Sequence, residues 1–176
     1  FQETEKVELK SIVQEDIKKE ILAFANCNGG TIYVGVSDHG EILGLEDIDA
    51  STLQISNMVR DRIKPDISMF IHYESLEYEG KSIIAIHIQR GSHRPYYLSK
   101  KGLRPEGVYV RQGYSSVPAS DTAIRQMIKE SDGDSFEEMR SIKQSLSFDA
   151  LRQEFKTRKL PFAQAQILQV LSRQKE

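Results

Sequence analysis

The chain has 176 residues, of which 39% are hydrophobic and 28% are charged, and its formal net charge at neutral pH is -2. This length suffices for one hydrophobic core with a small additional segment. The charge excludes a uniformly basic protein, so any site for nucleic acid has to be a local cluster of basic residues. Cys27 is the single cysteine, which excludes a disulfide framework and a thiolate zinc site.

Targeting and membrane signals are weak throughout the sequence. No apolar run approaches the ~20 residues that a membrane span requires. The first residues do not have the pattern of a signal peptide. We therefore expect a cytoplasmic protein, or a fragment of one, without a membrane partner.

The chain is expected to begin with a short strand and a helix. Val7 and Leu9 alternate with charged neighbours, which predicts the strand. Within residues 17–25, apolar side chains recur at i, i+4, i+7 and i+8, as on one face of a helix. Gly29 and Gly30 follow and can end that helix.

A strand and a hairpin are expected next. Residues 31–36 alternate between aliphatic and other side chains, which predicts a strand. Residues 38–40 read Asp-His-Gly and predict a turn. Residues 42–45 then return as the hairpin partner.

The middle of the chain predicts one helix and one long hairpin. Ser51 and Gln54 fit a capping box at the start of a helix that ends before Pro65. Residues 67–78 and 82–89 predict two antiparallel strands. The second of these strands is apolar on both faces, so we expect it inside the sheet.

The last third is irregular and then helical. Residues 90–107 contain several glycines and prolines and little periodicity. Residues 108–111 predict a strand and residues 113–116 a tight turn rich in hydroxyl groups. Ser120 can cap a further helix.

These elements predict an α+β fold with a mixed, mainly antiparallel sheet, packed helices and a helical C-terminal extension. The initial strand–helix–strand order allows one parallel pair with a right-handed crossover. We expect one domain at residues 1–131. Residues 132–176 form the extension, which we interpret as the start of a truncated following domain.

Several short motifs follow one another in a fixed order. They are Glu3-Thr4, Glu8-Leu9-Lys10, Ala23-Phe24-Ala25-Asn26, Gly29-Gly30, Gly35-Val36, Asp38 and Gly44. This series resembles the Schlafen AlbA domain family. The segment from Tyr109 to Ser116 also resembles the closing strand of that family, so the resemblance covers roughly residues 3–130.

The resemblance has implications for function. The family is a DNA-binding AlbA-like module of bacterial proteins regarded as transcriptional regulators, and it also lies within the Schlafen proteins of animals. It implies a nucleic-acid partner, DNA or RNA, and we also expect a homo-oligomer. In relatives, an ATPase-like or winged-helix domain often follows.

Four charged residues form a candidate catalytic set. Glu3, Glu8 and Asp38 could together bind Mg2+ or Mn2+ through carboxylate oxygens, with Lys10 beside a phosphate. The resemblance places these three carboxylates where the Schlafen endoribonucleases have their cleavage site. The alternative is a solvated strand edge, with Asp38 as an ordinary turn residue.

The spacing of the first two carboxylates sets a geometric condition. Glu3 and Glu8 are five positions apart, so on one straight strand their side chains face opposite sides. They converge only if the chain bends near residues 5–6.

A second candidate site lies in the irregular segment. Its basic residues, its tyrosines and a nearby serine are Arg90, His93, Arg94, Tyr96, Tyr97, Lys100, Lys101, Arg104, Arg111 and Ser115. The cations could neutralise phosphates and the tyrosines could stack on unpaired bases. The alternative is a solvated loop whose tyrosines pack on the core.

The sequence is therefore compatible with three functions. The first is the nucleic-acid-binding domain of a transcriptional regulator. The second is a Mg2+- or Mn2+-dependent endoribonuclease, and the third is a non-catalytic oligomerisation module.

Overall fold

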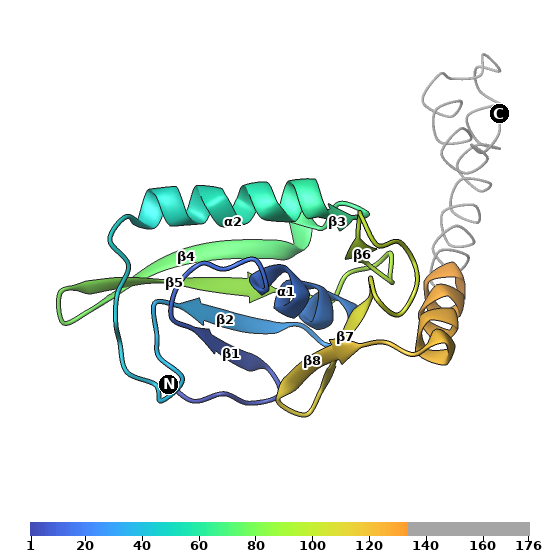
Figure 1. The fold of residues 1–176 in the computed structure, drawn as a ribbon, viewed down its shortest axis with the longest axis horizontal. Helices are drawn as coiled ribbons and strands as arrows, with labels where there is room; N and C mark the ends of the chain where they lie inside the picture. Colours follow the sequence, from blue (N-terminus) through green and yellow to red (C-terminus); the bar gives the residue numbers. More distant parts are fainter. Residues whose placement is uncertain (134–176) are drawn as a thin grey trace, which may run out of the picture. The chain divides into compact units, whose positions relative to one another are not determined.

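A computed structural model describes residues 1–133. The main sheet has four strands in the order β1-β2-β5-β4 (Figure 1). They are β1 (Val7–Lys10), β2 (Gly30–Val34), β5 (Lys81–Ile88) and β4 (Ile71–Tyr78). β1 and β2 are parallel, whereas β5 pairs antiparallel with both β2 and β4. The α+β class, the mixed sheet and the interior position of β5 are thus confirmed.

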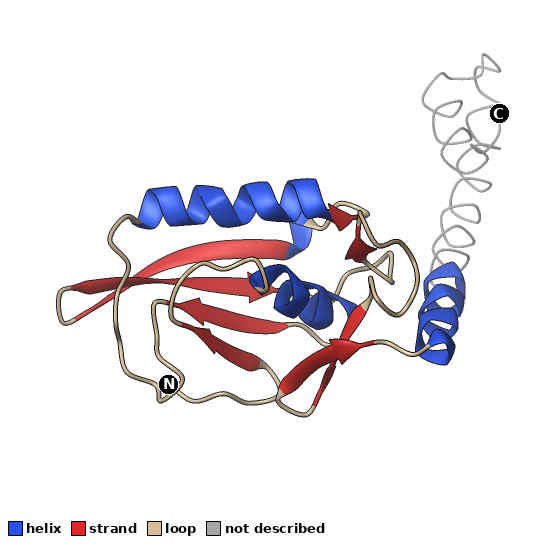
Figure 2. Ribbon diagram, in the orientation of Figure 1, coloured by secondary structure: helices blue, strands red, loops and turns tan. Residues whose placement is uncertain are grey.

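Two helices lie alongside this sheet (Figure 2). α1 (Ile17–Asn26) connects the parallel strands β1 and β2, and α2 (Ile48–Arg62) follows β2. A further helix spans residues 121–133, and its Ser120 cap is confirmed because the Ser120 hydroxyl accepts from the amide of Ala123 at 3.1 Å.

Two small strand pairs complete the described part. β3 (Ile63–Lys64) pairs antiparallel with β6 (Tyr97–Leu98), which lies inside the segment expected to be irregular. β7 (Tyr109–Gln112) and β8 (Ser115–Pro118) form a hairpin. A single 3-10 turn, η1 (Ser68–Phe70), precedes β4.

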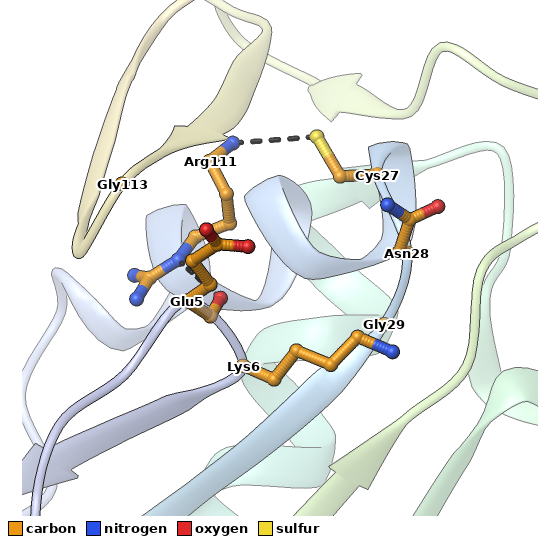
Figure 3. A pocket seen from close by; sticks show the side chains of 7 residues that line it. All are labelled: Glu5, Lys6, Cys27, Asn28, Gly29, Arg111 and Gly113. Carbon is orange, nitrogen blue, oxygen red and sulfur yellow. Dashed lines mark hydrogen bonds between the residues drawn. The ribbon is translucent and has the colours of Figure 1, made fainter.

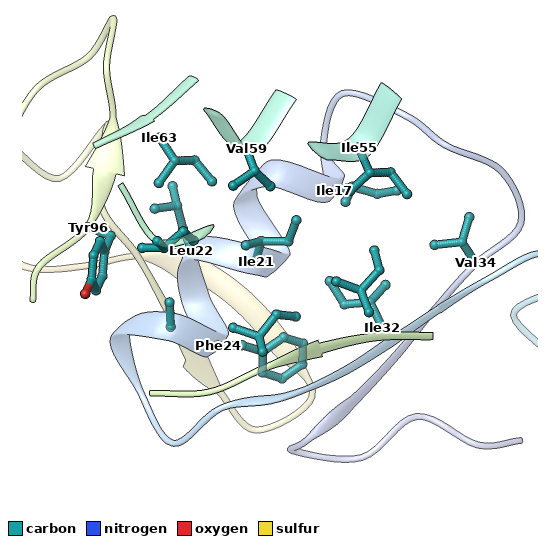
Figure 4. Close-up of a cluster of buried hydrophobic side chains, with 14 of the residues drawn as sticks. Ile17, Ile21, Leu22, Phe24, Ile32, Val34, Ile55, Val59, Ile63 and Tyr96 are labelled. Carbon is teal, nitrogen blue, oxygen red and sulfur yellow. The ribbon is translucent and has the colours of Figure 1, made fainter. Parts of the chain in front are cut away.

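The main core lies between the two helices and one face of the sheet (Figure 4). α1 contributes Ile21 and Phe24, α2 contributes Ile55 and Val59, and Ile86 of β5 lies beneath them. All five side chains are almost completely buried. Each such burial contributes roughly 1.5–3 kcal/mol.

The other sheet face carries a smaller cluster. Leu9 and Ile83 are buried there. The Phe1 ring lies beside Tyr33 and Tyr78, at centroid distances of 4.6 and 5.6 Å. The N-terminal residue thus covers part of this face.

Two predicted boundaries are wrong, and an aspartate accounts for each. α2 begins at Ile48 rather than after Ser51, because the Asp47 carboxylate accepts from the amide of Ala50 at 3.0 Å and caps the helix. β4 begins at Ile71 rather than at residue 67. Asp66 accepts from the amide and hydroxyl of Ser68 at 3.0 and 2.7 Å, which supports η1.

The predicted hairpin return at residues 42–45 is reduced to one bridge between Val36 and Ile42. The amides of Leu43 and Gly44 both donate to the carbonyl of Gly35, at 2.8 and 2.9 Å, so the chain curls instead of forming a ladder. The extension predicted at 132–176 lies, except for its first two residues, outside the described residues. In residues 1–133, no helix has the length and apolar character that crossing a membrane requires.

Candidate functional site

The bend that would bring Glu3 towards Glu8 is present. The amides and carbonyls of Thr4 and Val7 form two mutual hydrogen bonds of 3.0 and 3.3 Å, which fold the chain back before β1. The Glu3 carboxylate then accepts from the amide of Leu9 at 3.4 Å. The folded-back segment thereby occupies the outer edge of β1, which would otherwise be exposed.

Glu8 is joined to a buried ion-pair network. Nη1 of Arg111, on β7, donates to Glu8 at 2.8 Å and to Glu20 of α1 at 3.2 Å. The three side chains are 5%, 11% and 13% exposed, respectively. The Ser116 hydroxyl accepts from Arg111 at 3.1 Å and donates to Glu20. The guanidinium also lies 4.5 Å from the centroid of the Phe24 ring.

This environment changes the acidity of Glu8. Burial raises the pKa of Glu8 to about 7. The Arg111 hydrogen bond lowers the pKa, while the charges of Glu20 and Glu3 raise it further. Glu8 is therefore a carboxyl group that titrates near neutral pH.

Lys10 belongs to the same network. Its ammonium lies 3.3 Å from Glu20 and 3.1 Å from Asp16. Burial lowers the pKa of Lys10, but the two carboxylates outweigh burial and the pKa is raised. Lys10 thus neutralises carboxylates of α1 and its N-cap.

Asp38 does not join this network. It is exposed in a turn that the hydrogen bond from the Gly40 amide to the Ser37 carbonyl closes at 2.9 Å. In the part of the chain described, no three His, Cys, Asp or Glu side chains are grouped so that they could hold a metal ion. Glu3, Glu8 and Asp38 are not assembled into such a group, and the Mg2+ or Mn2+ site stays a prediction.

Asn26 fixes the irregular segment against α1. Its side-chain amide donates to the carbonyls of Tyr96 and Tyr109, each at 3.0 Å, and its oxygen accepts from the Tyr96 amide at 2.7 Å. The carbonyl of Asn26 accepts from Arg94 at 3.1 Å. Asn26 is 2% exposed, so these groups make their hydrogen bonds away from water.

Several residues of the second candidate site therefore have contacts inside the protein. Arg94 and Tyr96 are buried, and the Tyr96 hydroxyl accepts from the amide of His93 at 3.1 Å. Arg111 is held by the carboxylates described above. Tyr97 is half-buried and packs against the small buried cluster that includes Val108.

The remaining basic residues of that site are exposed. They are Arg90, His93, Lys100, Lys101 and Arg104, and we call them the basic loop. The basic loop runs along α1. The Gly91 amide donates to the carbonyl of Ala25 near the C-terminal end of α1, and Lys100 lines the same pocket as Lys18, which lies in the first turn of α1. Ser115 is exposed on β8 and is not part of this segment.

A pocket of about 250 Å3 lies at the end of the basic loop beside the start of α1. Its lining residues are Lys18, Lys19, Arg62, Leu98, Ser99, Lys100 and Lys101, and we call it the cationic pocket. Lys18, Lys19 and Arg62 were not among the sequence candidates. They belong to two helices that the sequence does not place beside the loop.

A second pocket, of about 140 Å3, lies at the C-terminal end of α1 (Figure 3). Lys6 extends across it towards Gly29, and Glu5 lies near the Arg111 guanidinium. The Arg111 amide donates to the sulfur of Cys27 at 3.3 Å. This pocket carries charges of both signs.

Comparisons with known proteins identify the family. The family model described as "Schlafen, AlbA_2" matches residues 3–120. Comparison with curated protein sequences gave no match.

The solved structures that are similar to this chain include the following two. One is the crystal structure of the DIP2311 protein from Corynebacterium diphtheriae, with 21% identity and a TM-score of 0.49 over 65% of this chain. The chain spans 22% of that protein. The other is the solution structure of the N-terminal domain of a RecG-related protein from Nitrosomonas europaea, with 22% identity and a TM-score of 0.46. That match covers 62% of this chain and 78% of the other.

The family match extends over more than half of the chain and contains the motifs from Glu3-Thr4 to Gly44 that suggested it. The chain therefore belongs to the Schlafen AlbA_2 family.

Proposed function

We propose that this domain binds nucleic acid through the basic loop. The observation that supports the proposal is the set of five exposed basic side chains within residues 90–104. Glu106 is the one acidic residue in residues 90–107. In a chain of net charge -2, this segment is a local site of positive charge.

The expected contacts are mainly with phosphates. Lysine and arginine side chains that neutralise phosphates release counterions, so affinity depends strongly on salt and weakly on sequence. Tyr96 is buried and does not stack on bases in this arrangement. Tyr114, at the tip of the β7–β8 hairpin, is 63% exposed and is available for stacking. A role within a transcriptional regulator rests on the family alone.

A binding assay with charge-reversal variants tests this proposal. Labelled transfer RNA and duplex DNA are titrated with the wild type and with Lys100→Glu/Lys101→Glu. We expect binding at least ~10-fold weaker for this variant, because two phosphate contacts become repulsive.

The matched control has the same change in net charge at other exposed sites, Lys81→Glu/Lys129→Glu. It should bind within about 3-fold of the wild type. Equal losses in the two variants would show that net charge alone, and not the basic loop, governs binding.

A second candidate function is metal-dependent RNA cleavage. The observation in its favour is Glu8, a buried carboxyl group with a pKa of about 7, beside which Glu3 is folded back. A carboxyl group that titrates near neutral pH can transfer protons at that pH. Metal-dependent cleavage additionally requires Mg2+ or Mn2+ at carboxylates such as Glu3, Glu8 and Asp38.

The same samples, with Mn2+ or with a chelator, test this second function. Glu8→Gln should abolish Mn2+-dependent cleavage and preserve binding, while Glu5→Gln, an exposed neighbour, should cleave normally. Cleavage that persists in Glu8→Gln would exclude Glu8 from the reaction. A defined dimer with neither binding nor cleavage would favour the oligomerisation module.

A further inference from the structure

We propose that the cationic pocket binds the terminal phosphate monoester of a nucleic-acid strand whose backbone lies on the basic loop. This inference rests on the proposed function and adds the part of the strand that is recognised. It depends on the charge, the shape and the rigidity of the pocket.

The pocket holds more positive charge than the adjacent carboxylate of Glu15 can neutralise. Five of its lining side chains are cationic, and they come from α1, α2 and the segment after β6. Glu15, which is 63% exposed, accepts from Lys18 at 2.9 Å and from Arg62 at 3.0 Å. Among residues 1–133, the ammonium groups of Lys100 and Lys101 form no hydrogen bond or ion pair.

The excess charge fits a monoester better than a diester. A phosphate monoester carries about -1.5 to -2 charges at pH 7, whereas each internal phosphodiester carries one. The first turn of α1, with Lys18 and Lys19, adds the positive end of the helix dipole. An anion that carries nearly two negative charges is therefore stabilised more strongly in this pocket than an anion that carries one.

The size of the pocket favours entry of a strand end. Its volume is about 250 Å3. This space accommodates a phosphate group and part of its sugar. A terminal phosphate enters end-on and offers three free oxygens to cations on several sides. An internal phosphate offers two free oxygens, and the sugars on both sides of it have to remain outside the pocket.

The walls of the pocket are held together without a ligand. The Ser99 amide donates to the carbonyl of Arg62 at 2.8 Å, and Leu98 pairs with Ile63 in the β3–β6 ladder. Lys19 lies over the Tyr109 ring, 5.4 Å from its centroid. A preformed site requires little ordering when an anion binds.

The position of the pocket connects it to the basic loop. Lys100 and Lys101 line the pocket and belong to the loop, and Arg104 follows after two residues. The carbonyl of Lys101 accepts from the Arg104 side chain at 2.7 Å. A strand whose end lies in the pocket can therefore continue along the loop.

The test compares oligonucleotides that differ only at their ends. Single strands of one sequence, about 12 nucleotides long, carry a 5′-phosphate, a 3′-phosphate or hydroxyl groups at both ends. Binding is measured by fluorescence anisotropy with an internal label. We expect the wild type to bind one phosphorylated strand at least ~5-fold more tightly than the hydroxyl strand, and the preferred strand identifies the end that is bound.

Two neutralised variants separate the pocket from the loop. Lys19→Gln/Arg62→Gln changes pocket residues outside the basic loop, and it should lose the preference while binding the hydroxyl strand within about 2-fold of the wild type. His93→Gln/Arg104→Gln changes the loop outside the pocket. It should weaken binding of all strands and keep the preference.

The possible failures are distinguishable. Equal wild-type affinity for all three strands, or a preference that survives in Lys19→Gln/Arg62→Gln, would overturn the inference about the pocket and leave the proposed function intact. Absence of binding to every strand would overturn both.

Discussion

Asn26 connects α1 to two segments that follow 70 and 83 residues later. Replacing it by alanine would leave the amide and carbonyl of Tyr96 and the carbonyl of Tyr109 without these partners. A buried polar group without a partner costs about 1–3 kcal/mol. We therefore expect Asn26→Ala to lower the free energy of unfolding by about 3 kcal/mol, measured by urea denaturation.

Asn28 provides the control for this prediction. It is exposed, and its side chain accepts one hydrogen bond from Arg90, at 3.2 Å. Asn28→Ala should cost less than about 1 kcal/mol. An equally small decrease in the free energy of unfolding for Asn26→Ala would contradict the role assigned to Asn26.

Glu8 makes stability depend on pH in a defined direction. Its pKa of about 7 in the folded protein exceeds the value of about 4.3 expected in the unfolded chain. Between these values the folded state binds a proton that the unfolded state has released, so stability falls as pH rises through this window. Glu8→Gln removes this titration.

As the pH rises from 5 to 8, the free energy of unfolding of Glu8→Gln should increase relative to that of the wild type by about 1–3 kcal/mol. Urea denaturation at four pH values in this range measures it. Glu5→Gln, at an exposed side chain, is the control for replacing a glutamate in this segment. Parallel pH profiles for the wild type and Glu8→Gln would be inconsistent with the buried carboxyl group.

Part of the site could be predicted at the level of residues. The spacing of Glu3 and Glu8 requires a bend if their side chains are to converge, and the structure contains this bend. The partnership of Glu20 with Arg111 could not be predicted, because 91 residues separate them and no local pattern relates one to the other. The role of Asn26 was likewise hidden, since helix termination explains an asparagine at that position equally well.

At the scale of elements, the junction between α1 and β2 depends on a glycine. Gly29 has a positive φ of 77°, and a Cβ atom there would lie 2.6 Å from the carbonyl oxygen of Ile88. Gly80, in the β4–β5 turn, has nearly the same φ, 79°, but no atom within 4 Å of its Cβ position. Comparing the two sites separates backbone strain from steric conflict.

We expect Gly80→Ala to lower the free energy of unfolding by about 1–2 kcal/mol, because alanine is strained at a positive φ even where there is no steric contact. Gly29→Ala should cost at least ~1–3 kcal/mol more, because β5 has to move. Thermal and urea unfolding of both variants measures the difference. Equal costs would show that the contact between Gly29 and β5 is not tight.

Periodicity predicted α1 and β5 well, since both bury a continuous apolar pattern. The starts of α2 and β4 were missed because Asp47 and Asp66 form short-range hydrogen bonds that override the pattern. β6 has two residues, too few for periodicity to indicate a strand.

At the scale of the whole described domain, the sequence predicted the fold class and the inner position of β5, and its strand–helix–strand start allowed the parallel β1–β2 pair that the structure contains. It could not predict that the basic loop runs along α1 and meets Lys18, Lys19 and Arg62. This arrangement depends on the buried hydrogen bonds of Asn26 and on the β3–β6 pair. The cationic pocket is therefore a product of tertiary packing.

The salt dependence of nucleic-acid binding tests the central claim most directly. The dissociation constant for duplex DNA and for transfer RNA is measured from about 50 to 200 mM salt, for the wild type and for Lys100→Glu/Lys101→Glu. We predict a linear logarithmic plot for the wild type and a slope smaller by about 1.4–1.8 in the variant, since each of the two lost phosphate contacts removes roughly 0.7–0.9. Binding that does not change with salt, or identical slopes for the two proteins, would contradict recognition of phosphates by the basic loop.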